Sequence, residues 1–263
     1  MAMVSVRFYA ELGDFVLPSR RQVTFTHSVP DRASVKDVIE SLGVPHTEVD
    51  LVLVNGESVD FSYQVQDGDR ISVYPVFESL DITPLVRVRP QPLREPRFVL
   101  DTHLGKLAGY LRLLGFDTLY RNDYADPLLV QLARQERRIL LTRDRGLLKH
   151  RLVTHGYHVW ETDPRRQVVE VLRRFDLAGA VAPFRRCLRC NGLLVPVPKR
   201  EVAEQLPPKT RQYYDDFRRC AGCGRVYWKG SHYDRMLGLV QSVLAQLREA
   251  GQRGTAADDP PSQ

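Results

Sequence analysis

Two aspartates follow short apolar runs at matching places in the chain, and carboxylates in such positions can hold a metal. The run Phe98–Leu100 stops at Asp101, and the run Ile139–Thr142 is followed closely by Asp144. If both runs are parallel strands, their carboxylates meet at the carboxyl edge of the sheet, where open α/β folds hold ligands. Clustered carboxylates need a cation, and Mg²⁺ or Mn²⁺ with a substrate phosphate suits them. The pattern predicts phosphodiester hydrolysis by metal-activated water.

A third carboxylate is expected in the segment RNDYAD, residues 121–126, where either Asp123 or Asp126 could serve. The alternative for Asp126 is structural, because an aspartate directly before a proline commonly caps a helix. The same capping role is expected for Asp163. Arg143, just before the second aspartate of the pair, could orient a phosphate or be only a surface charge.

All four cysteines of the chain lie in two CxxC pairs, Cys187–Cys190 and Cys220–Cys223. A glycine follows soon after each pair, which lets the backbone turn tightly so that amide groups can point at the sulfurs. Four thiolates closing a tetrahedral site describe structural Zn²⁺, because no position stays open for water. The alternative is a redox pair, but two pairs that bracket one insert favour zinc.

The insert between the cysteine pairs is basic and contains Tyr213, Tyr214 and Phe217. These aromatic side chains could stack on bases, while basic neighbours contact phosphates. The basic neighbours are Lys209, Arg211, Arg218 and Arg219. The alternative is that the aromatic residues pack onto the metal-binding module.

The elements that must position these residues follow from periodicity. From residue 97 onward, apolar runs alternate with helical spacing, which predicts a mostly parallel sheet with right-handed crossovers. The expected strands after the first are 116–120, 139–142 and 157–162, and the expected helices carry the leucines at 104, 107, 111 and 114 up to Gly115, the segment after Asp126-Pro127, and 167–175. Another strand, VYWKG, is followed by a helix that starts at Ser231.

Composition favours a polyanionic partner. Lys and Arg number 38 against 32 Asp and Glu, the sequence pI is 9.2, and the basic residues crowd the second half of the chain. RNA or DNA suits this charge, although a merely solvated basic surface is the alternative. No apolar run approaches the length of a membrane span, and the N-terminus lacks the apolar region of a signal peptide, so a cytoplasmic location is expected.

The first eighty residues predict a separate α+β domain. Residues 4–10 and 22–26 alternate like a hairpin, and Ser34 caps an amphipathic helix that Gly43 ends. The stretches VNGESV and DGDRISVYPV resemble the β-grasp, ubiquitin-like fold of small sulfur-carrier proteins. Those carriers end in a Gly-Gly tail, whereas this strand continues through YPVFES. RNA docking or partner docking is therefore expected rather than sulfur transfer.

Four prolines between Asp81 and Pro96 indicate an extended linker and a domain boundary. The expected organisation is a ubiquitin-like β-grasp domain at 1–80, a Pro-rich linker at 81–96, an α/β nuclease domain at 97–183, a zinc ribbon with a C-terminal helix at 184–250, and a disordered tail at 251–263.

The motifs FVLDTHLGKLAGYLRLLGFDT, RILLTRDRGLL, the paired CxxC and VYWKGSHYDRM resemble the Mut-seven C-terminal RNase domain, a PIN-like nuclease with a zinc ribbon. The resemblance implies an α/β fold with a ribbon, often preceded by a ubiquitin-like domain. It also implies RNA cleavage by acidic residues with Mg²⁺ or Mn²⁺. Carried over by motif, the first acid is Asp101 and the TRD acid is Asp144; Asp126 is the preferred middle acid, with Asp123 second.

The SHYDRM segment is characteristic of that family, and we expect it to lie over the carboxylates and contact the scissile phosphate. Lys229, His232 and Arg235 are therefore expected to bind substrate together with Arg143. The competing role for His232 is a core or capping hydrogen bond. Taken together, the sequence predicts a metal-dependent ribonuclease; the alternatives are a non-catalytic RNA-binding module and a partner-docking adaptor that acts through the ubiquitin-like domain. Oligomeric state is left open.

Overall fold

A computed structural model of the chain describes residues 1–75, 87–88 and 96–255. The predicted linker at 81–96 lies almost wholly outside these residues. The chain divides into two compact units. One comprises Met1–Glu95 and Ala125–His158, and the other comprises Pro96–Tyr124 and Val159–Gln263. Within the described ranges, no helix combines the length and apolar character that crossing a membrane requires.

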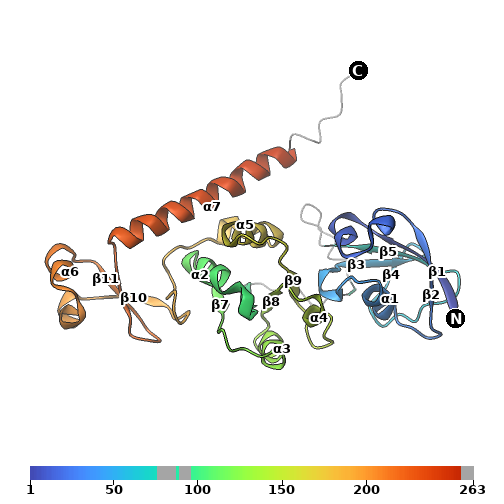
Figure 1. The fold of residues 1–263 in the computed structure, drawn as a ribbon, viewed down its shortest axis with the longest axis horizontal. Coiled ribbons are helices and arrows are strands. Elements are labelled where there is room, and N and C mark those ends of the chain that lie inside the picture. Colours follow the sequence, from blue (N-terminus) through green and yellow to red (C-terminus); the bar gives the residue numbers. More distant parts are fainter. Residues whose placement is uncertain (76–86, 89–95, 256–263) are drawn as a thin grey trace, which may run out of the picture. The chain divides into compact units, whose positions relative to one another are not determined.

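The N-terminal part of the first unit has the predicted β-grasp fold, with one helix on a five-stranded sheet of order β2-β1-β5-β3-β4 (Figure 1). The strands are β1 (Ala2–Phe8), β2 (Phe25–Val29), β3 (Leu51–Val54), β4 (Glu57–Ser58) and β5 (Arg70–Tyr74). The helix is α1 (Val35–Ser41), and 3-10 turns occur at η1 (Ala10–Phe15), η2 (Pro18–Arg20) and η3 (His46–Glu48). β1 is antiparallel to β2 and parallel to β5, which is the ubiquitin-like arrangement.

Local chemistry explains the ends of these elements. Ser34 caps α1 as predicted, in a capping box with Asp37 in which each residue's side chain accepts from the other's backbone amide. Asn55 and Gly56 both have positive φ, 53° and 91°, which is the conformation that a tight hairpin turn requires. The Asn-Gly pair therefore fixes the register between β3 and β4.

A second, four-stranded sheet has the order β7-β6-β8-β9. Its strands are β6 (Arg97–Leu100), β7 (Asp117–Leu119), β8 (Ile139–Thr142) and β9 (Gly156–His158). β6 runs parallel to β7 and β8 runs parallel to β9, as the alternation of strands and helices predicts. The helices between and after them are η4 (Thr102–Leu104), α2 (Gly105–Leu113), α3 (Asp126–Gln135), α4 (Arg145–Leu148) and α5 (Pro164–Arg174).

The predicted strand at 157–162 is wrong in its second half, because β9 ends at His158. The amides of Trp160 and Glu161 donate instead to the carboxylate of Glu170, at 2.8 and 3.0 Å. A side chain ten residues away thus takes the place of a neighbouring strand. The capping prediction for Asp163 is confirmed, since its carboxylate accepts from the amides of residues 165 and 166 at the start of α5.

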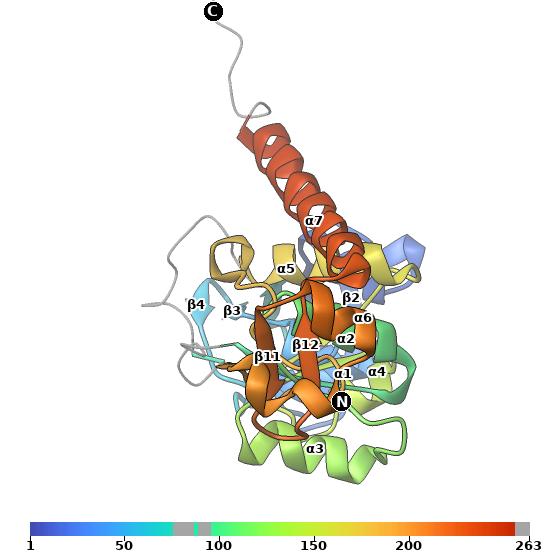
Figure 2. The same cartoon turned by 90° about the vertical axis from the view of Figure 1, so that its left-hand side faces the viewer.

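The remaining sheet is a three-stranded antiparallel ribbon of order β10-β11-β12 (Figure 2). Its strands are β10 (Leu194–Val197), β11 (Phe217–Cys220) and β12 (Val226–Trp228), joined by η6 (Lys199–Glu201), η7 (Ala203–Gln205) and α6 (Pro208–Tyr213), with η5 (Ala178–Ala180) preceding the ribbon. The long helix α7 (Ser231–Thr255) follows and packs on α5 through a face that includes Val240 and Val243. It therefore continues through residues 251–255 of the predicted disordered tail; residues 256–263 lie outside the described chain.

The aromatic residues of the ribbon insert take different roles. Phe217 is 1% exposed and forms a small core with Val197 and Val202, and Tyr214 packs against it. Tyr213 is 69% exposed. The packing alternative therefore holds for Phe217 and Tyr214, and only Tyr213 stays available for stacking on a base.

Candidate functional site

The four cysteines come together in one cluster, although the two pairs lie thirty residues apart in the chain. Their sulfur atoms all lie within 4.8 Å of one another, with 3.7 Å between Cys187 and Cys223 and 3.3 Å between Cys190 and Cys220. Tetrahedral zinc with Zn–S bonds of about 2.3 Å would place its sulfurs roughly 3.8 Å apart. Among the described residues, no other group of three or more His, Cys, Asp or Glu side chains lies close enough together to hold a metal ion. The cluster can hold a metal ion.

The backbone around the cluster is shaped by close approach. A Cβ on Gly192 would lie 2.9 Å from the sulfur of Cys220, so only glycine fits there. In the first pair, the positive φ of 71° falls on Asn191 rather than on the glycine. In the second pair the left-handed residue is Gly224, with φ of 73°. The predicted tight turns are present, but the two glycines serve different purposes.

Hydrogen bonds already favour the thiolate form of one cysteine. Burial raises the pKa of the Cys187 thiol, but hydrogen bonds from the Tyr227 hydroxyl and from backbone amides outweigh it and lower the pKa to about 6. The sulfur lies 3.0 Å from the Tyr227 oxygen. Such outer contacts orient metal ligands and tune their basicity.

A buried arginine fixes the first cysteine pair to the α/β core. Arg112, on α2, is 5% exposed and directs all its hydrogen bonds at backbone carbonyls. Its acceptors are Thr118 at 2.9 Å, Leu188 at 3.1 Å, Arg189 at 3.1 Å and Tyr120 at 3.3 Å. Burial lowers the pKa of the guanidinium, and the nearby Cys187 and Cys190 favour its charge. Arg112 therefore links β7 to the CxxC turn, because its guanidinium donates hydrogen bonds to the backbone of both.

Asp101 follows β6 as predicted and is 7% exposed. Its Oδ1 accepts from the amide and the hydroxyl of Thr102, at 2.5 and 3.1 Å, which caps η4. The carbonyl of Thr102 in turn accepts from the hydroxyl of Tyr120 at 2.9 Å. Gly105 makes room for that ring, because a Cβ there would lie 2.6 Å from the Tyr120 oxygen. These hydrogen bonds hold the backbone on the C-terminal side of Asp101 in one conformation.

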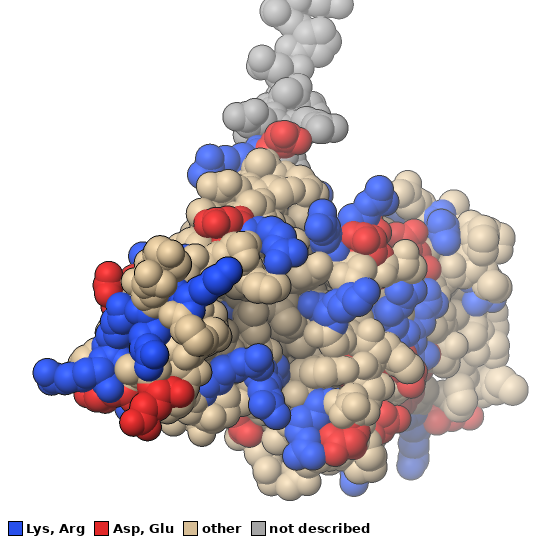
Figure 3. Space-filling model, turned by 60° about the vertical axis from the view of Figure 1, so that its left-hand side comes forward, with Lys and Arg blue, Asp and Glu red and all other residues tan. Residues whose placement is uncertain are grey.

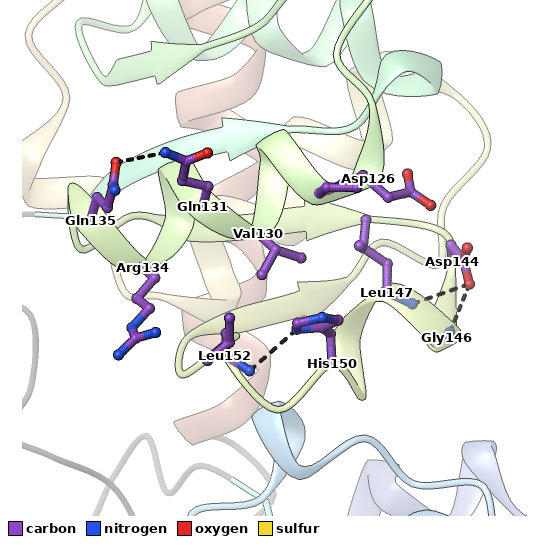
Figure 4. A pocket seen from close by; sticks show the side chains of 11 residues that line it. Asp126, Val130, Gln131, Arg134, Gln135, Asp144, Gly146, Leu147, His150 and Leu152 are labelled. Carbon is purple, nitrogen blue, oxygen red and sulfur yellow. Dashed lines mark hydrogen bonds between the residues drawn. The ribbon is translucent and has the colours of Figure 1, made fainter.

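Asp126 and Asp144 line one pocket of about 550 Å³ in the first unit. Asp126 is the first residue of α3, and Asp144 precedes α4, directly after β8 and Arg143. Figure 4 shows both carboxylates at one end of the pocket. The Oδ1 of Asp144 caps α4, because it accepts from the amides of Gly146 at 2.7 Å and Leu147 at 3.4 Å. Two carboxylates from different elements therefore face one cavity.

The capping alternative for Asp126 is wrong. The N-cap of α3 is Ala125, no side chain makes a capping bond there, and Asp126 and Pro127 are the first two helical residues. Proline has no amide hydrogen to donate and is therefore tolerated in the first helical turn, where Pro127 follows Asp126. Asp126 therefore keeps an exposed carboxylate at the positive end of a ten-residue helix, a favourable place for negative charge.

Asp123, the rival third carboxylate, is in the second unit and does not line this pocket. Its two oxygens accept a bidentate pair of bonds from Arg121, at 2.9 and 2.7 Å. Those hydrogen bonds lower the pKa of the Asp123 carboxyl. A metal would have to compete with this exposed arginine, so the geometry favours Asp126.

The four residues predicted to bind substrate are all exposed. Lys229 forms an ion pair with Asp216 at 3.0 Å. His232 and Arg235, one turn apart at the start of α7, share a bond of 3.0 Å between the guanidinium and Nδ1. The competing core role for His232 is therefore excluded, since its contact is on the surface. Arg143 lies beside Asp144 at the end of β8. Figure 3 shows lysine and arginine side chains gathered in several groups on one face.

Sequence reasoning missed the other residues that line the pocket with the two aspartates. They are Pro127, Val130, Gln131, Arg134, Gln135, Gly146, Leu147, His150 and Leu152. Five of the nine lie on one face of α3, at spacings of three and four residues. The sequence displays this spacing when the helix begins at Asp126. His150 and Leu152 belong to a loop without periodicity, and only the fold places them here.

Comparisons with known proteins bear on both parts of the chain. The family model described as "Mut7-C RNAse domain" matches residues 96–240, and the model described as "Mut7-C ubiquitin" matches residues 1–81. The crystal structure of small archaeal modifier protein 1 of H. volcanii is 20% identical over 29% of this chain and 100% of its own, with a TM-score of 0.25. A putative molybdopterin converting factor, subunit 1, from Pyrococcus furiosus is 20% identical over 29% and 100%, with a TM-score of 0.24. No curated protein matches the chain.

Proposed function

We propose that this chain, which belongs to the Mut7-C RNAse domain family, is a ribonuclease that hydrolyses RNA phosphodiester bonds with the help of Mg²⁺ or Mn²⁺. The observation that supports this most is the pocket shared by Asp126 and Asp144. Two carboxylates in one cavity repel each other unless a cation lies between them. The excess of Lys and Arg, 38 against 32 acidic residues, suits an RNA substrate.

Asp101, Asp126 and Asp144 are the proposed metal ligands, and Asp123 is the second choice for the middle position. Asp101 belongs to the second unit and does not line the pocket. It is included because it follows β6 as Asp144 follows β8, and because the family motif has its first acid at this position. A bound divalent ion would supply an activated water and offset the negative charge that develops on the phosphate. In the overall reaction, the water oxygen joins phosphorus, the bond to the ribose oxygen breaks, and that oxygen takes up a proton.

The substrate-binding roles go to Arg143, Lys229, His232 and Arg235. Because His232 uses Nδ1 toward the guanidinium of Arg235, the hydrogen of its neutral ring is on Nε2, where it can be donated to a phosphate oxygen. Arg235 adds positive charge beside it. To bind a phosphate, Lys229 would have to give up its ion pair with Asp216. This would cost little free energy, because both side chains are exposed.

We assign the cysteine cluster to structural Zn²⁺. All four sulfurs are protein ligands, so the tetrahedron is closed and no site for water remains. Its role is to hold the ribbon and, through Arg112, the edge strand β7. The ribbon's exposed Tyr213 and basic residues would then contact RNA outside the cleavage site.

Substitution of the aspartates tests the function. We expect Asp101→Asn, Asp126→Asn and Asp144→Asn each to reduce Mn²⁺-dependent cleavage of total RNA by more than the roughly 10–100-fold that second-layer changes cost, with RNA binding retained. Asp123→Asn should have a smaller effect. Asp163→Asn is the matched control, because asparagine preserves its cap on α5.

The rival function is a non-catalytic RNA-binding module or a docking adaptor. Both predict that the purified protein yields no new RNA ends with Mn²⁺ or Mg²⁺, and this result would reject the ribonuclease. Of the two, only the RNA-binding module predicts that the protein still binds RNA. Full loss of cleavage in Asp123→Asn, with Asp126→Asn active, would instead move the third ligand to Asp123. Sequencing of the cleaved ends would identify the RNA and separate internal from terminal attack.

A further inference from the structure

The pocket that Asp126 and Asp144 share is larger than a metal and one phosphate require. Its lining continues along one face of α3 to Arg134, eight residues from Asp126, which is about 12 Å along the helix axis. Its volume of about 550 Å³ lies in the range of sites that enclose small organic ligands. Figure 4 shows Arg134 and Gln135 at the end opposite the two carboxylates. The part of the pocket beyond the two carboxylates is lined by other kinds of side chain.

We propose that this space binds the RNA nucleotide next to the cleaved bond and reads its base. The proposal rests on the proposed function, because the carboxylates fix where the cleaved phosphate lies. The floor of the space is apolar: Val130 is 4% exposed and Leu147 is 6% exposed, and Leu152 adds a half-buried side chain. A base splayed out of single-stranded RNA presents a flat face that such a floor can cover.

Two glutamines of α3, Gln131 and Gln135, also line the pocket. The Nε2 of Gln131 donates weakly to the Oε1 of Gln135, at 3.4 Å (Figure 4). This bond leaves the oxygen of Gln131 free to accept a hydrogen bond and the nitrogen of Gln135 free to donate one. The edges of bases differ in their donors and acceptors, so these two amides can discriminate among bases.

The rim of the space carries hydrogen-bond donors for a phosphate. Arg134 is exposed and has no ion-pair partner among the described residues. The Nδ1 of His150 accepts from the amide of Leu152 at 3.3 Å, so the hydrogen of the neutral ring is on Nε2. An apolar floor, two amides and a cationic rim suit a nucleotide better than an apolar peptide, which would leave Arg134 without a partner.

Binding of mononucleotides tests the pocket without relying on cleavage. The full-length protein with Mg²⁺ would be titrated with AMP, GMP, CMP, UMP and inorganic phosphate, followed by calorimetry and by amide shifts in NMR spectra. At least one nucleotide should bind about 10-fold more tightly than phosphate, since contacts to one base contribute roughly 1–3 kcal/mol. Equal affinity for all five probes would overturn base binding.

Variants then locate the contacts. Gln131→Ala with Gln135→Ala should change the order of nucleotide affinities and the base found at the cleaved ends. Arg134→Ala should raise KM for RNA about 5–10-fold with a smaller change in kcat, as expected for a phosphate contact. The matched controls, Gln241→Ala and Arg151→Ala, replace exposed residues that do not line the pocket.

The two proposals fail in different ways. A protein that binds nucleotides but cleaves no RNA would refute the ribonuclease and leave the pocket standing. A protein that cleaves RNA with the same base profile and KM after the glutamine and arginine substitutions would refute the pocket and leave the ribonuclease standing.

Discussion

The carboxylate of Glu48 accepts a hydrogen bond of 2.6 Å from the backbone amide of His158, 110 residues further along the chain. Glu48 belongs to η3 of the ubiquitin-like domain and is 2% exposed, and His158 ends β9. Nearby, a ring nitrogen of His46 lies 2.8 Å from the carbonyl oxygen of Val153. Polar residues that would be surface residues in a free β-grasp domain are thus buried against the segment that follows Asp144.

Glu48→Ala tests this contact. Without the carboxylate, the buried amide of His158 loses its acceptor, which costs about 1–3 kcal/mol of unfolding free energy. Glu57→Ala, at an exposed residue of β4, is the matched control and should change stability by less than about 0.5 kcal/mol. Urea denaturation of the full-length protein measures both. Equal midpoints for the two variants would show that the domains do not depend on each other here.

The same histidine predicts a pH dependence. Burial, and then the positive charges of Arg145 and Arg143, lower the pKa of His158 to about 4 in the folded protein. In the unfolded chain the ring takes a proton near pH 6.5. Between these values the unfolded state binds more protons, so stability falls as the pH drops from about 6.5 to about 4. Above pH 6.5 this contribution is complete.

His158→Gln stays neutral throughout this range and should show a smaller loss of stability between pH 7 and pH 4.5. Thermal unfolding at several pH values measures the slope. His103→Gln, in which an exposed histidine of η4 is replaced, should keep the slope of the parent protein. Parallel curves for the parent and His158→Gln would contradict the assignment.

Arg112 should stabilise the cysteine module as well as the α/β core. Arg112→Met keeps much of the apolar stem but leaves buried carbonyls without donors, and we expect a loss of about 3 kcal/mol or more. Zinc should also leave the variant faster under a chelator. Arg189→Met, at an exposed side chain in the same turn, is the control. Unchanged zinc release in Arg112→Met would limit the arginine to a role in the core.

Zinc removal provides a separate test of the cluster. Elemental analysis should find one zinc per chain, and each Cys→Ser substitution should lower this content. Stripping the metal should disorder the ribbon, which the fluorescence of Trp228 on β12 can report. Added Zn²⁺ should restore the signal. A metal-free protein with an intact ribbon would contradict structural zinc.

Much of the fold could be predicted because the relevant forces act between close neighbours in the chain. The apolar runs before Asp101 and Asp144 are strands, and Ser34 and Asp163 cap their helices. The CxxC spacing was equally informative, since four thiolates in two tight turns have few uses other than a shared ion. Helix periodicity and turn chemistry repeat within a few residues, so the sequence displays them directly.

The errors arose where a distant or competing partner decided the outcome. The strand predicted through residue 162 ends early because Glu170 takes its amides, and Asp126 is helical because Ala125 occupies the cap position. The last correction bears on function, since it leaves the Asp126 carboxylate facing the pocket.

The sequence by itself determined which residue types could hold metals and which elements carry them. Only the tertiary structure decided that Asp126 shares a pocket with Asp144, that Arg112 serves the carbonyls of a distant turn, and that Glu48 is buried against His158. The reason is physical: a buried polar group takes whichever partner the packing of remote segments brings within reach, and no local pattern records that choice.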